Sequence, residues 1–282
     1  MDKKIIFFDC DGTILNKNYI SRRTLYTFQR LKDKGHILIL STGRALPIIQ
    51  DILKQLPIDN VICSAGGCVI IDRKIIWENY FSYEQLKEII DYFDKYGMIY
   101  NLECNDYVYI QKGSRERHLK RIQFLNQGEI SMKELSQKFD EKYVELDNLE
   151  QLKVNKIHWF EDTVLYDHHE LLNYDLISKK FKDRYHVIPL LGNKLSIGGE
   201  ISKKGITKQK GLKIILDYFQ INRDNIYAIG DDMNDKEMLE YATHAIAMGQ
   251  APEEIKNICE YVTEDVEHDG FSKAMEHFNL ID

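Results

Sequence analysis

The sequence predicts an α/β fold, in which a Rossmann-like parallel sheet forms the core domain and an α+β cap domain is inserted into it. Two observations predict the core: short apolar runs recur near both ends of the chain, and helical patterns separate them. A third observation, a series of strand and hairpin patterns in the middle of the chain, predicts the insertion. We expect a discontinuous core of residues 1–82 and 196–282 and an inserted cap of residues 83–195.

The N-terminal part of the core begins with a buried strand. Residues 5–8 form a continuous apolar run, which is typical of strands covered on both faces of a parallel sheet. A helix is expected between Ser21 and Gly35, because apolar residues recur on one face and the glycine is a natural stop. Two further apolar runs, at residues 37–40 and 61–63, predict two more buried strands.

The same alternation returns near the C-terminus. Apolar residues at positions 212, 215, 216 and 219 have the spacing of an amphipathic helix. Apolar runs at residues 226–229 and 245–248 predict two strands, each followed by a glycine. Strands separated by helices imply right-handed crossovers, so these strands should join the N-terminal ones in one parallel sheet.

The middle of the chain has a different pattern. Ser82 and Gln85 form a predicted capping box at the start of a helix. Residues 98–104 and 107–111 predict two strands joined by a tight antiparallel turn. Further strands are expected at residues 153–160 and within 186–197, the latter with a turn at 192–193.

Composition limits the class of protein. The chain has 282 residues, with 38 Lys and Arg against 45 Asp and Glu, and therefore a net charge of −7. This balance argues against a nucleic-acid partner, and no apolar run is long enough for a membrane helix. We expect a cytoplasmic monomer or weak homodimer with no nucleic acid and no membrane as partners. The odd number of scattered cysteines indicates reduced thiols, at Cys10, Cys63, Cys68, Cys104 and Cys259.

Acidic residues follow two of the predicted core strands. Asp9 and Asp11 come after the strand at 5–8, and Asp231 follows the strand at 226–229. These carboxylates should converge, because the carboxyl ends of parallel strands meet at one edge. Carboxylates within ~4 Å repel by about 4 kcal/mol per pair at an effective dielectric of about 20, and an oxygen-rich cluster of this kind suits Mg²⁺. Residues i and i+2 of an extended chain point to one side, which would place one carboxylate for attack and the other for proton transfer.

Other loops at the same edge carry groups that suit a phosphate. Thr42 offers a hydroxyl and a backbone N–H, and Gly43 allows a close approach to the backbone. Thr207 is a candidate N-cap for a helix beginning near Lys208, where a lysine suggests a bound anion. Each motif alone is more often a turn or a helix cap. Their occurrence together, in order along one sheet, predicts a phosphate-handling site.

These loops resemble the motifs of the haloacid dehalogenase-like phosphatase superfamily, and closely those of its Cof-like branch with a type IIB cap. Residues 9–13 are similar to the first motif, Asp-x-Asp-Gly-Thr, and residues 42–44 to the second, Thr-Gly-Arg. Residues 200–212 follow the third-motif spacing, which selects Lys208 among its neighbouring lysines, and residues 230–235 resemble the fourth motif. The resemblance covers almost the whole chain and is weak within the cap.

The resemblance implies a role for each site residue. Asp9 would attack the phosphorus and form an aspartyl-phosphate, and Asp11 would act as general acid and then as general base. Mg²⁺ would be held by the Asp9 carboxylate, the backbone carbonyl of Asp11 and Asp231. The phosphoryl oxygens would be held by Thr42, Gly43, Lys208, Asn234 and the backbone N–H of Cys10. Asp235 would orient Lys208 or a metal-bound water.

The sequence departs from the branch at three places. Residues 65–67 read Ala-Gly-Gly where the branch usually has Asn-Gly-Ala, Gln250 replaces an Asn, and Gln209 replaces a Gly. None of these changes removes a primary catalytic group.

The predicted function is a Mg²⁺-dependent phosphatase, a phosphoric monoester hydrolase that acts on small phosphorylated metabolites such as sugar phosphates or phosphorylated cofactors. Two alternatives are a phosphosugar mutase or phosphotransferase that uses the same aspartyl-phosphate, and a phosphate-ligand binding module without turnover. The cap is expected to close over the active site and supply specificity. Its basic run at 112–121 is either a solvated helix face or a set of side chains for an anionic substrate group, with Arg115, Arg117 and His118 as candidates.

Overall fold

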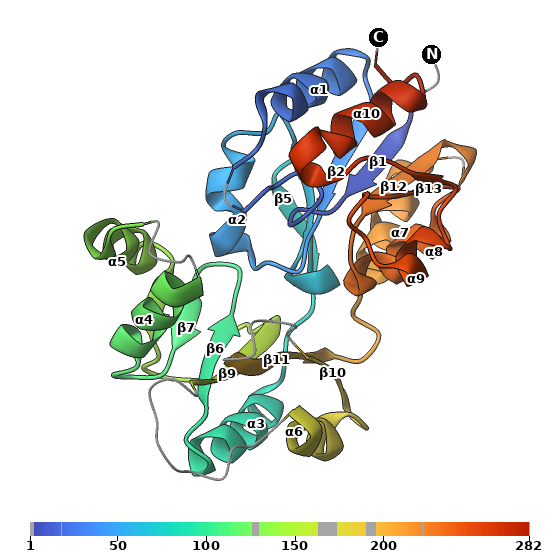
Figure 1. The fold of residues 1–282 in the computed structure, drawn as a ribbon. Coiled ribbons are helices and arrows are strands. Elements are labelled where there is room, and N and C mark those ends of the chain that lie inside the picture. The colour runs from blue at the N-terminus through green and yellow to red at the C-terminus, as the bar shows by residue number, and fades with distance from the viewer. Residues whose placement is uncertain are drawn as a thin grey trace. The chain divides into compact units, whose positions relative to one another are not determined.

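A computed structural model of the protein describes residues 3–17, 19–125, 130–162, 174–189, 196–221 and 223–281. The chain divides into two compact units (Figure 1). The first unit comprises Met1–Arg44, Ile49–Glu78 and Ile206–Asp282, and the second comprises Ala45–Ile48 and Asn79–Gly205.

The first unit is built on a sheet with the strand order β14-β13-β12-β1-β2-β3-β4-β5. The pairs from β14 to β3 are parallel, and β4 and β5 add an antiparallel extension. The strands are β1 (Ile5–Phe8), β2 (Ile37–Ser41), β3 (Asn60–Cys63), β4 (Cys68–Ile71), β5 (Lys74–Glu78), β12 (Ile226–Gly230), β13 (His244–Ala247) and β14 (Tyr261–Val262). The predicted parallel core is confirmed, whereas the β4–β5 extension was not predicted.

Helices cover both faces of this sheet (Figure 1). They are α1 (Arg22–Asp33), α2 (Leu46–Leu53), α7 (Lys208–Phe219), α8 (Lys236–Tyr241), α9 (Glu253–Lys256) and α10 (Gly270–His277), with 3₁₀ turns η1 (Ser64–Gly66), η2 (Arg223–Asn225), η3 (Met233–Asp235) and η4 (Val266–His268). Phe8 of β1 packs against Phe28 of α1 and Phe271 of α10. Phe7 belongs instead to an apolar cluster with Leu212 of α7. Adjacent residues of β1 thus face opposite helical layers, as its continuous apolar sequence requires.

Helix α7 begins where the sequence predicts. The Thr207 side chain accepts the backbone N–H of Lys210 and so caps the helix. The cap makes Lys208 the first residue of the helix. The amino end of α7 therefore presents this lysine at the carboxyl edge of the parallel sheet.

The second unit contains a mainly antiparallel sheet with the order β10-β11-β9-β6-β7-β8. Its strands are β6 (Ile99–Glu103), β7 (Val108–Ile110), β8 (Tyr143–Glu145), β9 (Lys156–Asp162), β10 (Tyr185–Pro189) and β11 (Ser196–Lys203), and its helices are α3 (Tyr83–Lys95), α4 (Arg115–Leu125), α5 (Met132–Asp140) and α6 (Tyr174–Phe181). The predicted capping box at Ser82 and Gln85 is present. The β6–β7 pair has the predicted hairpin register, with Cys104 N–H bonded to the carbonyl of Tyr107.

The boundary of the second unit differs from the expected one. Strand β11 pairs with β9 and β10, so the compact unit continues to Gly205 and does not end at residue 195. Gly198 and Gly199 interrupt the side-chain alternation by which a strand is recognised. A side chain at Gly199 would lie 2.7 Å from the Trp159 ring, which explains the glycine. The expected turn at 192–193 lies outside the described residues.

The two faces of the second sheet have opposite character. One face packs Leu102, Ile157 and Trp159 against α3 and α6 in an apolar core. The other face carries Lys156, whose ammonium group lies 2.5 Å from Glu200 and 3.3 Å from Glu103.

Within the described part of the chain, no helix combines the length and the apolar character needed to cross a bilayer.

Candidate active site

Three loops and one helix start place polar side chains at the carboxyl edge of the parallel sheet. Residues 9–13 follow β1, residues 42–44 follow β2, residues 231–235 follow β12, and Lys208 opens α7. All of them belong to the first unit. These are the positions that the strand pattern predicts for a ligand site in an open parallel sheet.

Lys208 forms the centre of the site. Its ammonium nitrogen donates to Asp9 Oδ1 at 2.5 Å, to Asp235 Oδ1 at 2.7 Å and to Asn234 Oδ1 at 3.4 Å. The Lys208 side chain is 1% exposed, so water contributes little to these contacts. Burial alone would lower the pKa of Lys208, but Asp235 and Asp9 raise it above its ordinary value. Lys208 is therefore a fixed cation.

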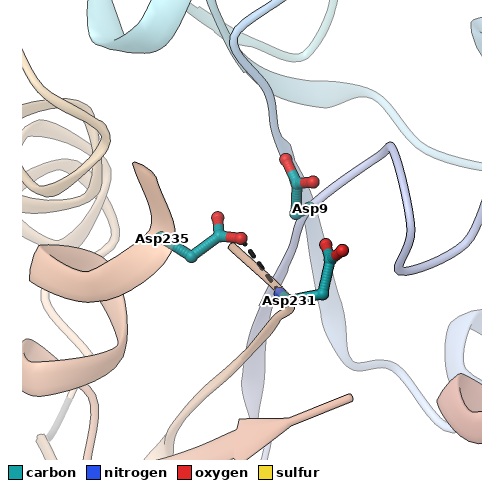
Figure 2. A group of neighbouring side chains, drawn as sticks. All are labelled: Asp9, Asp231 and Asp235. Atoms are coloured by element: carbon teal, nitrogen blue, oxygen red, sulfur yellow. Dashed lines mark hydrogen bonds between the residues drawn. The ribbon is translucent and has the colours of Figure 1, made fainter. Parts of the chain in front are cut away.

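Asp235 holds the loop after β12 in shape. While its Oδ1 accepts from Lys208, its Oδ2 accepts the backbone N–H groups of Asp231 at 3.1 Å and Asp232 at 3.3 Å. Figure 2 shows the contact with Asp231 as a dashed line. A side chain at Gly230 would lie 2.5 Å from the Asp235 carboxyl carbon, so the glycine is required there. Asp235 thus contacts Lys208 directly, and orienting Lys208 is one of the two roles that the resemblance implies for it.

Asp9, Asp231 and Asp235 form an acidic cluster (Figure 2). One carboxylate oxygen from each lies within 4.8 Å of the others. Burial and the neighbouring Asp235 raise the pKa of Asp9 to about 8, although Lys208 lowers it, and the same two causes raise the pKa of Asp231 to about 7. Burial is the larger cause of both pKa shifts, and repulsion from Asp235 adds to it.

The cluster fits a hard divalent cation. Carboxylate oxygens are the ligands that Mg²⁺ prefers, and a second cation would relieve the repulsion between Asp9 and Asp231. Asp235 is the least suited of the three as a ligand, because Lys208 and two backbone N–H groups already occupy both of its oxygens. The donor set therefore favours Asp9 and Asp231.

Asp11 does not join the acidic cluster through its side chain. Arg44 Nε donates to Asp11 Oδ2 at 2.8 Å, and Arg44 Nη2 donates to Asp11 Oδ1 at 2.5 Å. We expected Asp9 and Asp11 to point to one side of an extended strand, but β1 ends at Phe8 and the chain bends at Cys10. The i, i+2 rule therefore does not apply here.

Thr42 and Gly43 lie in the loop after β2. The backbone N–H of Thr42 donates to the carbonyl of Ile62, so the expected N–H donor to a phosphate is already engaged. The Thr42 hydroxyl accepts the backbone N–H of Arg44 at 3.1 Å, which leaves its own hydrogen to be donated. A Cβ at Gly43 would lie 3.9 Å from Asn234 Nδ2, so the two predicted phosphate-binding residues face each other.

Gly12 brings two of the loops into direct contact. It has φ +75°, a conformation that residues with a side chain rarely adopt, and a Cβ there would lie 2.1 Å from Asp231 Oδ2. The next residue, Thr13, donates its hydroxyl to Asp231 Oδ1 at 3.2 Å. The first motif thus supports the aspartate of the fourth.

Three residues have contacts that sequence reasoning did not assign. They are Arg44 on Asp11, Thr13 on Asp231, and Gln250 on Gly12. Arg44 and Thr13 lie inside the recognised motifs, so their place in the motifs could have indicated a role in the site.

Cys10 is buried and lies in the sequence between Asp9 and Asp11. Burial raises the pKa of its thiol, so the thiol is not a nucleophile.

Two candidates from the basic run at residues 112–121, Arg115 and His118, make contacts with other residues of the second unit. Arg115 makes a two-pronged contact with Asp140, and His118 is buried with its Nδ1 3.0 Å from the carbonyl of Ser114. Burial lowers the pKa of His118 to about 4, so the ring is neutral. These contacts favour a structural role for Arg115 and His118.

Sequence comparison identifies the family that this site fits. The sequence model of the haloacid dehalogenase-like hydrolases matches residues 6–275. A 5-amino-6-(5-phospho-D-ribitylamino)uracil phosphatase of Bacillus subtilis is 29% identical over 285 residues, which is 98% of each chain. A second phosphatase of Bacillus subtilis is 27% identical over 290 residues, covering 97% of this chain and 99% of that protein.

Solved structures share the fold. A hypothetical protein from Geobacillus kaustophilus superposes with a TM-score of 0.81 at 22% identity, covering 99% of this chain and 100% of that one. A haloacid dehalogenase subclass IIB sugar phosphatase superposes with a TM-score of 0.75 at 21% identity, with the same coverage. The similarity extends over both units of the chain, so the predicted α/β core with an inserted α+β unit is confirmed as a fold.

Proposed function

The chain belongs to the haloacid dehalogenase-like hydrolase family and is a phosphatase, and we propose that it hydrolyses small phosphorylated metabolites with Mg²⁺ through an aspartyl-phosphate on Asp9. The observation that carries the proposal is the buried contact between Lys208 and Asp9 inside an acidic cluster. A carboxylate held by a fixed cation at a strand end suits attack on an anionic phosphate. The expected cytoplasmic location and monomeric or weakly dimeric state stay predictions.

Asp9 has the geometry of an oriented nucleophile. Lys208 holds Oδ1, and in the described part of the chain no hydrogen-bond donor to Oδ2 is found, so Oδ2 is the oxygen available for attack. In the first step Asp9 Oδ2 forms a bond to phosphorus, and the bond between phosphorus and the substrate oxygen breaks. Positioning and charge neutralisation are the main catalytic effects in such transfers.

Asp11 is assigned the proton transfers. It donates a proton to the departing alkoxide, and in the second step it takes a proton from the water that attacks phosphorus, which releases phosphate and restores Asp9. Because both Asp11 oxygens accept hydrogen bonds from Arg44, the Asp11 side chain must turn away from Arg44 to reach the leaving oxygen. We assign the Arg44-bound form to the resting enzyme.

The remaining residues bind the phosphoryl group. The Thr42 hydroxyl, the Gly43 backbone, the Lys208 ammonium and the Asn234 side chain are assigned to its oxygens, together with the Cys10 N–H. Asp9, Asp231 and the Asp11 carbonyl would hold Mg²⁺. When bound, the ion neutralises the negative charge of the phosphate and of the nucleophile.

The first experiment measures phosphate release from p-nitrophenyl phosphate with Mg²⁺ and with EDTA. We expect release with Mg²⁺, none in EDTA and none from Asp9→Asn. Asp217→Asn, on the exposed side of α7, is a matched control that should behave as wild type. Wild-type activity in Asp9→Asn would refute the nucleophile assignment.

A second experiment addresses the substrate. The relative from Bacillus subtilis that is named for a ribitylaminouracil phosphate makes polyol phosphates the first compounds to test. A screen ranked by kcat/KM should find one class well above p-nitrophenyl phosphate. Analysis of the products separates a phosphatase, which releases free phosphate, from a mutase, which returns an isomerised sugar phosphate.

A further inference from the structure

Gln250 lies where three loops of the first unit meet. Its amide nitrogen donates to the Gly12 carbonyl at 2.5 Å and to Asp231 Oδ2 at 3.4 Å. Its amide oxygen accepts the backbone N–H of Val266 at 3.2 Å. The side chain thus joins the loop after β1, the loop after β12 and the turn η4. The mechanism proposed above gives this residue no role.

The three hydrogen bonds determine the orientation of the Gln250 carboxamide. A carboxamide has two N–H donors on nitrogen and an acceptor on oxygen. The Gly12 carbonyl and Asp231 Oδ2 only accept, and the Val266 N–H only donates. A reversed amide would place oxygen against two oxygens and nitrogen against an N–H, so only one orientation satisfies all three partners.

Gln250 completes the support of the Asp231 carboxylate. Thr13 donates to Oδ1 at 3.2 Å, Gln250 donates to Oδ2, and Gly12 lies so close that a Cβ there would be 2.1 Å from Oδ2. Both oxygens of the Asp231 carboxylate are therefore held in place by side chains of other loops.

The same amide also holds the backbone beside the other metal-binding group. The Gly12 carbonyl follows the Asp11 carbonyl by one residue, and the Asp11 carbonyl is assigned to the ion above. Anchoring Gly12 restricts how that peptide can turn. One side chain thus constrains groups that come from two different strands of the sheet.

We propose that Gln250 is a positioning residue for the divalent-metal site, where it sets the affinity for Mg²⁺ by holding the Asp231 carboxylate and the Gly12 carbonyl in place. The inference rests on the proposed function, because Asp231 is a proposed ligand. Groups that orient metal ligands typically change metal affinity by about 10- to 100-fold when they are removed. An Asn at this position is one methylene shorter, so we expect it to keep only part of the contacts with Gly12 and Asp231.

The test is a calorimetric titration of the full-length protein with MgCl₂ in the absence of substrate. We expect Gln250→Ala to raise the dissociation constant for Mg²⁺ about 10-fold or more, and Gln250→Asn to raise it less. At saturating Mg²⁺ the kcat of both variants should stay near that of wild type. Gln209→Ala is a matched control, because Gln209 is a partly exposed glutamine that donates to the Glu237 carbonyl outside the site.

Thermal unfolding in EDTA separates metal affinity from folding. An unchanged Mg²⁺ dissociation constant in Gln250→Ala, or a lower melting temperature as its only change, overturns the inference while leaving the proposed function intact. Wild-type protein that binds no Mg²⁺ overturns the proposed function itself. Gln250→Asn keeps an amide at the position and serves the same test if Gln250→Ala gives too little folded protein.

Discussion

The ammonium group of Lys208 lies 2.5 Å from Oδ1 of Asp9, and both side chains are buried at the carboxyl edge of the parallel sheet. The same ammonium contacts Asp235 at 2.7 Å. One cation between two buried carboxylates leaves negative charge in excess, consistent with a pKa of Asp9 that burial and Asp235 raise to about 8. This contact orients Asp9, the proposed nucleophile, and the excess negative charge favours the binding of a second cation.

Replacing Lys208 by methionine should lower both activity and stability. Removing one partner of a buried ion pair leaves uncompensated charge, with a typical cost of about 3–5 kcal/mol in the free energy of unfolding. Urea denaturation measures that loss, and phosphate release measures activity. Lys210→Met is the control, because Lys210 is exposed on the same helix. A Lys208→Met variant as stable and active as wild type would contradict the role assigned to the pair.

Replacing Asp11 by asparagine should affect substrates according to their leaving groups. A general acid contributes about 10²–10⁴ in rate when the leaving alcohol needs a proton. Nitrophenolate leaves without one, so phosphorylation of Asp9 by p-nitrophenyl phosphate should persist while hydrolysis of the phosphoenzyme slows. A burst of nitrophenol followed by a slow steady rate checks this expectation. Equal loss of both phases would argue against Asp11 as the acid.

Replacing Gly12 by alanine should strain the backbone and, in addition, displace Asp231 from the site. Left-handed φ angles cost roughly 1–2 kcal/mol for residues with a side chain, and the new Cβ would also collide with Asp231. Gly35→Ala is a close control, since Gly35 has φ +80° with nothing within 4 Å of its Cβ position. We expect similar backbone costs in the two variants but loss of Mg²⁺-dependent activity only in Gly12→Ala.

Glu103 should make the stability of the second unit depend on pH. Burial raises its pKa to about 7 from an ordinary 4.5, although Lys156 opposes the shift. The folded state therefore binds the proton more tightly, so this contribution to stability is complete below pH 4.5 and is lost as pH rises to about 7. Relative to Glu103→Gln, wild type should lose stability over that interval. The exposed Glu150→Gln variant should show no such difference.

Much of the core was predictable because its strands are covered on both faces. The continuous apolar runs at β1 and β12 admit no other burial pattern, and the site loops follow directly from them. Strand β5 was not predicted. Its first three residues, Lys74, Ile75 and Ile76, are all exposed, so apolar and polar residues do not alternate between a buried and an exposed face. Strand β11 was predicted only to residue 197, because its paired glycines interrupt the side-chain alternation.

The site itself was predictable by residue but not by side-chain direction. Asp9, Lys208 and Asp235 come together as the motif spacing implies. The direction of Asp11 could not be predicted, since it depends on the chain bending after β1 and on Arg44 arriving from the end of β2. Contacts between loops that lie far apart in sequence, such as Gln250 with Gly12, cannot be recognised from hydrophobic periodicity.

Phosphorylation of Asp9 during turnover is the step on which the proposed mechanism depends. Rapid acid quench of wild-type protein with Mg²⁺ and p-nitrophenyl phosphate, followed by peptide mass spectrometry, tests it most directly. We predict one added phosphoryl group on the peptide that contains Asp9, accumulating further in Asp11→Asn and absent from Asp9→Asn. Steady phosphate release from an enzyme whose Asp9 peptide is never modified, at a rate that Asp9→Asn retains, would contradict the account.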